Sequence, residues 1–136
     1  MLKFEAVGLF VDNMETMVTF YRDVIGLDIH WDGGGYTSCK IAGGISFSLC
    51  ERKILQSGII TPLAYPNGVN GTVELCFGAA SYSDVDREFA RLTAAGAKPV
   101  DKPSTAPWGQ RCCFVADPEG NLIEIWSSND DTTKTL

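Results

Sequence analysis

The strongest constraint on the fold is that one order of structural elements occurs twice along the 136 residues. Alternating apolar residues predict a strand over 3–11, and a helical apolar period predicts a helix over 14–25. Short strands separated by glycine-rich turns follow. The same order returns after Gly71, where the helix is expected over 83–95. A matched order of this kind predicts an α+β fold built from two βαβββ modules.

Capping signals are expected at both ends of the two helices. Asp12, with Glu15 three residues later, is expected to cap the first helix, and Ser83 is expected to cap the second. Gly26 and Gly96 are placed to end these helices. The remaining strands are expected at 28–32, 36–41 and 45–50 in the first module and at 72–78, 98–101, 110–116 and 121–127 in the second.

The segment boundaries follow from this pattern. We expect one domain over residues 1–127, with module one at 1–51, a connector at 52–70 and module two at 71–127. A connector of this length in a small domain is expected to cover a site or to contact a partner. The polar residues 128–136 are expected to form a flexible, solvated tail.

Charge and cysteine content exclude several classes of protein. The formal net charge is −6, whereas binding to nucleic-acid phosphates requires a basic surface. No apolar run is long enough to span a bilayer, and the N-terminus follows a strand pattern and not that of a secretory signal. The five cysteines include no Cys-x-x-Cys pair, so free thiols are expected. We therefore expect a cytoplasmic protein without nucleic-acid or membrane partners.

Two motifs carry a family resemblance, FYRDVIGL at Phe20–Leu27 and DPEGNLIE at Asp117–Glu124. With these motifs the chain resembles the glyoxalase / bleomycin-resistance / dioxygenase superfamily, also called vicinal oxygen chelate, over residues 3–127. The resemblance implies that the modules form a curved mixed sheet enclosing a cup, with the helices on its outer face. It also implies a homodimer.

The same resemblance locates a metal site whose ligands are mostly missing. Family members draw one metal ligand from each of four strands, and the matching positions here are Ala6, Ser48, Thr72 and Glu124. A catalytic transition metal requires several histidine or carboxylate ligands, and only Glu124 is one. By strand alternation, Glu74 points into the cup as a second carboxylate. No metal or other cofactor is therefore expected, and a divalent metal, if one binds, is expected at Glu124.

Two further residues have alternative interpretations. His30 is expected at the surface or rim, and would act as an acid or base if it faced the cup. Trp108 lies in a Pro-Trp-Gly segment that recurs in the bleomycin-resistance-like branch, beside the ligand groove. There it would offer a flat face to a planar or cationic ligand. Its alternatives are packing on its own loop or at a dimer interface.

Two functions from different classes fit these observations. The first is a metal-independent small-molecule-binding protein of the bleomycin-resistance/glyoxalase-like type, with the ligand in the cup or a dimer groove. Its expected ligand-binding residues are Ala6, Ser48, Thr72, Glu74, Trp108 and Glu124. The alternative is a glyoxalase-type lyase or isomerase, or a ring-cleaving dioxygenase, with a degenerate or unusual metal site. The missing ligands oppose it, because an enediolate requires a Lewis acid, and no catalytic residue is assigned. A regulatory domain that acts through a partner is a third interpretation.

Overall fold

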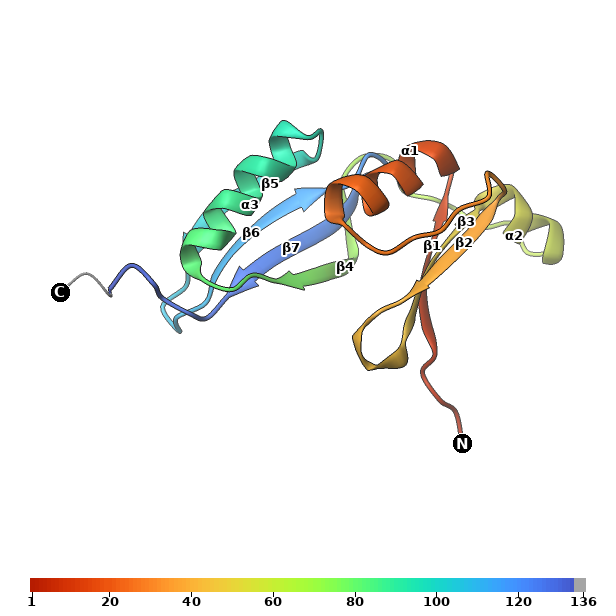
Figure 1. The fold of residues 1–136 in the computed structure, drawn as a ribbon. Helices are drawn as coiled ribbons and strands as arrows, with labels where there is room; N and C mark the ends of the chain where they lie inside the picture. The colour runs from red at the N-terminus through yellow and green to blue at the C-terminus, as the bar shows by residue number, and fades with distance from the viewer. Residues whose placement is uncertain (134–136) are drawn as a thin grey trace. The chain divides into compact units, whose positions relative to one another are not determined.

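The computed structural model describes residues 1–133 of the chain. The chain divides into two compact units, with the boundary between Tyr65 and Pro66. The first, called unit 1 below, contains a three-stranded sheet, and the second, unit 2, contains a four-stranded sheet (Figure 1). Within the described residues, no helix is long and apolar enough to cross a membrane.

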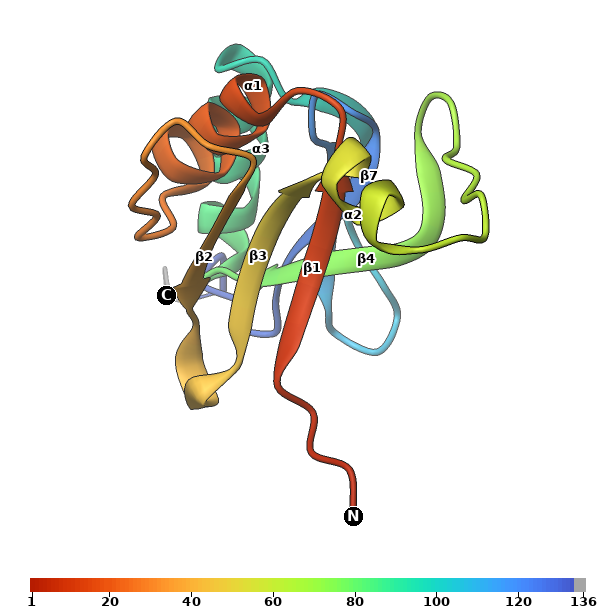
Figure 2. The ribbon, with the colours of Figure 1, turned by 90° about the vertical axis from the view of Figure 1, so that its right-hand side faces the viewer.

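Unit 1 has two layers. Its three strands form a sheet, and a helix packs on one face of that sheet. The strands are β1 (Ala6–Val11), β2 (Tyr36–Lys40) and β3 (Ser46–Glu51). Strand β3 lies in the centre, parallel to β1 and antiparallel to β2 (Figure 2). The helical segments are α1 (Met14–Thr19), the π-helical turn η1 (Phe20–Ile25), the 3-10 turn η2 (Ala42–Gly44) and α2 (Arg52–Gly58).

The core of unit 1 lies between the apolar stripe of its first helix and the apolar face of β3. Helical spacing places Met17, Val18 and Tyr21 on one stripe, and all three are buried. Strand alternation places Phe47 and Leu49 of β3 on the face toward this stripe. The rings of Tyr21 and Phe47 pack with their centroids 5.1 Å apart. The other face of this sheet is therefore left uncovered by α1.

Two expectations for unit 1 were wrong. Residues 28–32, all within the described chain, form no strand. Their polar groups are satisfied locally, since the Trp31 indole donates to Gly34 O and Gly34 N donates to Asp32 Oδ1. The first helix is capped by Asn13, whose Oδ1 accepts from Thr16 N at 2.9 Å, and not by Asp12. The helix otherwise ends where predicted, at Gly26 with φ 96°.

The connector contains a helix that the sequence pattern did not predict. Helix α2 covers residues within the expected connector 52–70. Its first residue, Arg52, donates from Nε to Phe10 O at 3.2 Å. The Arg52 guanidinium also lies over the ring of Tyr65, 4.4 Å from its centroid. These contacts fasten both ends of the segment 52–65 within unit 1.

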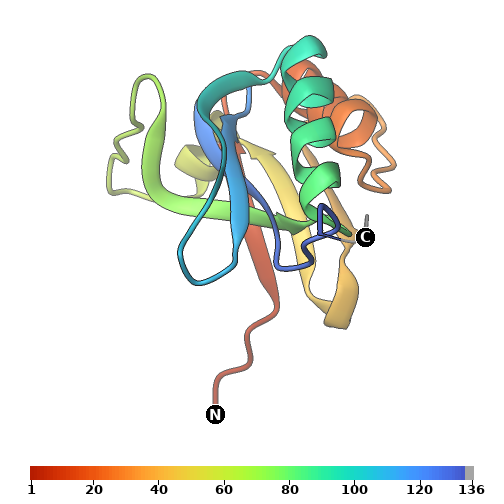
Figure 3. The ribbon, with the colours of Figure 1, turned by 90° about the vertical axis from the view of Figure 1, so that its left-hand side faces the viewer.

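Unit 2 contains the complete strand–helix–three-strand order. Its elements are β4 (Asn70–Gly78), α3 (Tyr82–Ala94), β5 (Lys98–Thr105), β6 (Arg111–Ala116) and β7 (Asn121–Ser127). The sheet order is β4-β7-β6-β5, with β4 parallel to β7 and the other pairs antiparallel. Helix α3 runs along one face of this sheet (Figure 3). The side chains buried between helix and sheet are Val85 and Leu92 of α3, Cys113 and Val115 of β6, and Ile123 and Ile125 of β7.

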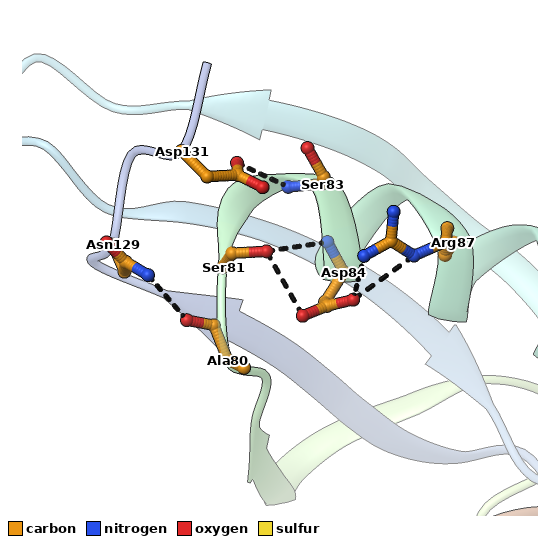
Figure 4. Close-up of polar contacts among 7 residues, drawn as sticks. All are labelled: Ala80, Ser81, Ser83, Asp84, Arg87, Asn129 and Asp131. Atoms are coloured by element: carbon orange, nitrogen blue, oxygen red, sulfur yellow. Dashed lines mark hydrogen bonds and ion pairs between the residues drawn. The ribbon is translucent and has the colours of Figure 1, made fainter. Parts of the chain in front are cut away.

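The N-terminus of α3 is capped from its own chain and from the C-terminal segment. Ser81 is the N-cap, and its Oγ accepts from Asp84 N at 3.2 Å. The expected cap, Ser83, was therefore wrong by two residues. Ser83 N instead donates to Asp131 Oδ1 at 3.1 Å (Figure 4).

Residues after β7 lie against this helix start. Tyr82 N donates to Asn129 O at 2.9 Å, and Asn129 Nδ2 donates to Ala80 O at 2.9 Å. Residues 129–131 belong to the segment 128–136 that the sequence predicts to be a flexible tail. Residues 134–136 of that segment lie outside the described residues.

The capping geometry yields a first prediction. Ser81→Ala is expected to lower the free energy of unfolding by about 1 kcal/mol, because Asp84 N loses its acceptor. Ser83→Ala is expected to cost less, because the backbone amide of Ser83 keeps its bond to Asp131. Urea unfolding of both variants measures the difference. A larger loss for Ser83→Ala than for Ser81→Ala would contradict the assignment of the cap.

Candidate functional site

The face of the unit 2 sheet opposite α3 carries a mixed set of polar and aromatic side chains. Ile123 and Ile125 of β7 are buried under α3, so alternation directs Glu124 to the opposite face. Glu74 lies on the same face from β4, as expected from the sequence. We call this surface the open face of unit 2. The residues that share it by register are Glu74, Cys76, Cys112, Phe114, Leu122, Glu124 and Trp126.

Glu124 lies at the centre of this face. The register pairs it with Cys76 of β4 on one side and with Phe114 of β6 on the other. Cys76 Sγ donates to Glu124 Oε2 at 3.6 Å. One ligand atom from each of Glu74, Cys76 and Glu124 lies within 4.8 Å of the other two. Two carboxylates and a thiol therefore converge on one point of an exposed sheet.

The environment of this cluster favours the protonated forms of Glu74 and of the neighbouring thiols. The pKa of Glu74 is raised, first by partial desolvation on the sheet and then by a hydrogen bond to Glu124 and its charge. Desolvation and the two carboxylates also raise the pKa of Cys76 from 9.0 to about 11. The pKa of Cys112 is raised by the same causes. Neither thiol is thus a nucleophile at neutral pH, since the reactive form is the thiolate.

The raised pKa of Glu74 makes stability depend on pH. The native state holds the Glu74 proton more tightly than the unfolded chain, whose value is near 4.5. This contribution is present below pH 4.5 and is lost as pH rises through the native pKa. Glu74→Gln cannot ionise and can still donate to Glu124. It is expected to be more stable than the parent by about 0.5 kcal/mol at neutral pH, a small gain because Glu74 is exposed.

Thermal unfolding of the parent and Glu74→Gln at acidic and neutral pH measures this gain. The expected difference between the two proteins disappears in acid, where both side chains are neutral. Glu88→Gln, on the exposed side of α3, is the matched control and should show no such trend. A gain for Glu74→Gln that is equal at both pH values would contradict the assigned cause.

The other three positions that the resemblance matches to metal ligands are Thr72, Ala6 and Ser48. Thr72 lies in the stretch of β4 between Asn70 and Glu74, where the register with β7 shifts and the strand bends (Figure 3). Ala6 and Ser48 belong to unit 1, where β1 and β3 pair. A methyl group, two hydroxyls and one carboxylate do not form the donor set that a catalytic divalent metal requires.

The unit 1 positions lie on the open face of their own sheet. Ser48 pairs with Gly8, and a Cβ on Gly8 would lie 2.6 Å from Ser48 Oγ, so Gly8 leaves room for that hydroxyl. Ala6 lines a hollow of about 340 Å³ together with Tyr36, Lys40 and Ser46. This hollow is wide enough for a small molecule, and its lining includes the carboxylate of Glu5 but not Ser48.

His30 and Trp108 are both exposed. The imidazole of His30 is 90% exposed and lies 3.2 Å from Asp28, on the loop that replaces the expected strand. Trp108 is 78% exposed on the turn between β5 and β6, with its indole N–H donating to Gln110. Tyr82 holds this turn by donating to Gly109 O. Trp108 therefore does not pack on its own loop, and its ring is presented to solvent.

Sequence reasoning assigned no role to Cys76 or Cys112. The sequence alone does place Cys76 on this face, because it follows Glu74 by two residues on the same strand. Cys112 is different, since its approach to Glu124 depends on the antiparallel register of β6 and β7. That register is not visible in the spacing of either strand alone.

Comparisons with known proteins agree on the fold. A family model described as Glyoxalase/Bleomycin resistance protein/Dioxygenase superfamily matches residues 3–125. The uncharacterized protein YraH of Bacillus subtilis (strain 168) is 24% identical over 134 residues, covering 92% of this chain and 98% of YraH. A glyoxalase-related enzyme from Fulvimarina pelagi superposes with a TM-score of 0.77 at 21% identity, covering 93% of this chain and 88% of that one. A lactoylglutathione lyase from Agrobacterium tumefaciens superposes with a TM-score of 0.67 at 24% identity, covering 98% and 97%.

Proposed function

The chain belongs to the glyoxalase/bleomycin resistance protein/dioxygenase superfamily, and on that premise we propose that it is a small-molecule-binding protein that uses no catalytic metal. The ligand is held on the open face of unit 2. The observation that carries this proposal is the convergence of Glu74 and Glu124 on an exposed sheet surface. The donor set at Ala6, Ser48, Thr72 and Glu124 supports the absence of a catalytic metal.

The chemistry of this face favours a cationic, planar ligand. Two neighbouring carboxylates attract positive charge, and the net charge of −6 adds to that attraction. Phe114 pairs with Glu124 across the register, and Trp126 lies two residues along the same strand on the same face, so both offer apolar ring surface beside it. An organic cation with an aromatic part would satisfy both features, since a cation over a ring face gains further attraction.

A ligand screen tests this proposal. Organic cations and neutral planar compounds are added to protein kept in a chelator, and tryptophan fluorescence is followed. Binding of a cationic compound is expected to weaken at least about tenfold in Glu124→Gln, because a charge-assisted contact is lost. Glu88→Gln, which lies on α3, should bind like the parent, and Trp108→Ala shows whether the exposed indole contributes.

The state of the ligand after incubation distinguishes binding from catalysis. Mass spectrometry is expected to recover the ligand unchanged. Affinity that is equal in the parent and Glu124→Gln would exclude the open face of unit 2 as the site. A chemically altered ligand would overturn the binding role in favour of an enzyme.

A second candidate is proton transfer by Glu74 and Glu124 in an enzyme of the lyase or isomerase type. The raised pKa of Glu74 supports it, because the shift moves this carboxyl group toward the pH at which it can both give and take a proton. His30, on an exposed loop, gives it no support. If this candidate holds, mass spectrometry should detect no chemically altered ligand after incubation with Glu74→Gln. A ring-cleaving dioxygenase has no supporting observation beyond the fold.

Oligomeric state and location are also proposals. The family premise favours a homodimer, and light scattering of the purified protein tests it. The five cysteines are all free in the structure, which suits a reducing cytoplasm.

A further inference from the structure

We propose that the open face of unit 2 binds a thiophilic divalent cation, of the class of Zn²⁺ or Cd²⁺. Its ligands are Cys76, Glu74 and Glu124, whose donor atoms already converge. Cys112, a diagonal neighbour of Glu124 that is not in this group, becomes the fourth when its side chain turns toward them. Only Glu124 is shared with the four family positions, so this site has a different donor set. This proposal and the organic-ligand proposal can each fail without the other.

The cluster geometry matches what such an ion requires. A tetrahedral zinc ion, with bonds of about 2.3 Å to sulfur and about 2.1 Å to oxygen, holds the two donor atoms about 3.6 Å apart. Cys76 Sγ and Glu124 Oε2 are 3.6 Å apart. All three donor atoms of the cluster lie within 4.8 Å of one another. Small changes in side-chain torsion of exposed Glu74 would bring its oxygen into the same sphere.

The sheet places the four donors by register and alternation. Glu74 and Cys76 are two residues apart on β4 and so lie on one face. Cys76 is paired with Glu124 across the parallel ladder. Cys112 faces Trp126 on β6 and is therefore the diagonal neighbour of Glu124. Three adjacent strands thus present the donors without any loop having to fold around the ion.

The mixture of donors selects the class of ion. Thiolate ligands favour zinc, cadmium and similar soft ions, whereas magnesium and calcium favour oxygen alone. The thiol of Cys76, with Cys112 on the neighbouring strand, distinguishes this cluster from a group of acidic side chains on a surface. The two carboxylates would in turn be relieved of their mutual repulsion by a positive charge between them.

Titration with Cd²⁺ of reduced, untagged protein freed of metal by a chelator tests the proposal. We expect one equivalent to bind, with the ultraviolet absorption that arises from charge transfer between sulfur and cadmium. Cys76→Ser is expected to abolish most of this absorption and to weaken binding at least about tenfold. Glu124→Gln is expected to weaken binding by a similar factor while the absorption at saturation persists.

Control variants separate this site from the other thiols. Cys50→Ser, which removes a partly buried thiol of unit 1, is expected to bind Cd²⁺ like the parent. Cys112→Ser is expected to lower the absorption at saturation without eliminating it. Circular dichroism confirms that each variant is folded. The proposal is overturned if less than one equivalent binds, if Cys76→Ser keeps the full absorption, or if Cys50→Ser loses as much as Cys76→Ser. The organic screen in chelator does not depend on any of these outcomes.

Discussion

Replacing Gly120 with alanine is expected to lower the free energy of unfolding by about 3 kcal/mol. Gly120 ends the turn between β6 and β7 with φ 93°. A Cβ at this position would lie 2.1 Å from Gly68 O and 2.7 Å from Gly68 C. Both are backbone atoms, so the contact is relieved only by moving one of two chain segments. Urea unfolding measures the loss.

Gly96→Ala is the matched control for this prediction. Gly96 also has a positive φ, 107°, but nothing lies within 4 Å of a Cβ built on it. Its substitution therefore measures the backbone strain alone, expected at about 1 kcal/mol. Equal losses for Gly96→Ala and Gly120→Ala would show that Gly68 yields easily and would contradict the larger figure.

Asp117→Ala is expected to lower the free energy of unfolding by a similar amount, about 3 kcal/mol. The Asp117 side chain is fully buried. Its Oδ1 accepts from Glu119 N at 2.9 Å and from Asn121 N at 3.0 Å, and its Oδ2 accepts from Asn121 Nδ2 at 2.8 Å. Alanine would leave these half-buried donors without this acceptor, next to a fully buried side-chain position. Urea unfolding again gives the loss.

Asp117→Asn tests whether the hydrogen bonds are the cause. An asparagine keeps one oxygen for the amides of Glu119 and Asn121 but turns its own NH₂ toward Asn121 Nδ2. Its expected loss is intermediate, about 1.5 kcal/mol. If the asparagine variant lost as much as the alanine variant, the two backbone bonds would contribute nothing measurable.

Both substitutions bear on the site, because this turn fixes how β6 and β7 align. The register pairs Ala116 with Leu122 beside the turn and carries Phe114 opposite Glu124. A slip of one residue would exchange the two faces of β7. Glu124 would then lie under α3, and Ile123 would lie on the open face. A rigid turn is therefore a condition for the carboxylate cluster to exist.

The sequence predicted the features that depend only on the two-residue alternation of side chains along a strand. Alternation along β7 and β4 indicated that Glu124 and Glu74 share a face, because a strand has only two faces. It was less informative for Thr72, since the shift in register between Asn70 and Glu74 interrupts the alternation. Nothing in a run of polar residues marks where a strand is bulged.

Other features depend on competition between neighbouring residues. Asp12 and Asn13 are both good caps, and the structure uses the one whose oxygen reaches Thr16 N. Residues 28–32 have strand-like alternation, but side-chain bonds such as Asp32 to Gly34 N close the chain into a loop. These outcomes differ by small free energies and are decided by the surrounding fold. Patterns within a short window do not contain that information.

The contacts between the C-terminal segment and α3 affect how this helix opens. The first amides of a helix lack intrahelical acceptors and usually exchange quickly with deuterium. In α3, the amides of Tyr82 and Ser83 donate to Asn129 O and Asp131 Oδ1. Their exchange therefore requires the segment after β7 to detach first. Slow exchange at these two amides would report attachment of that segment. Truncation of the chain after Ser128 would make both exchange rapidly while the helix centre stays protected.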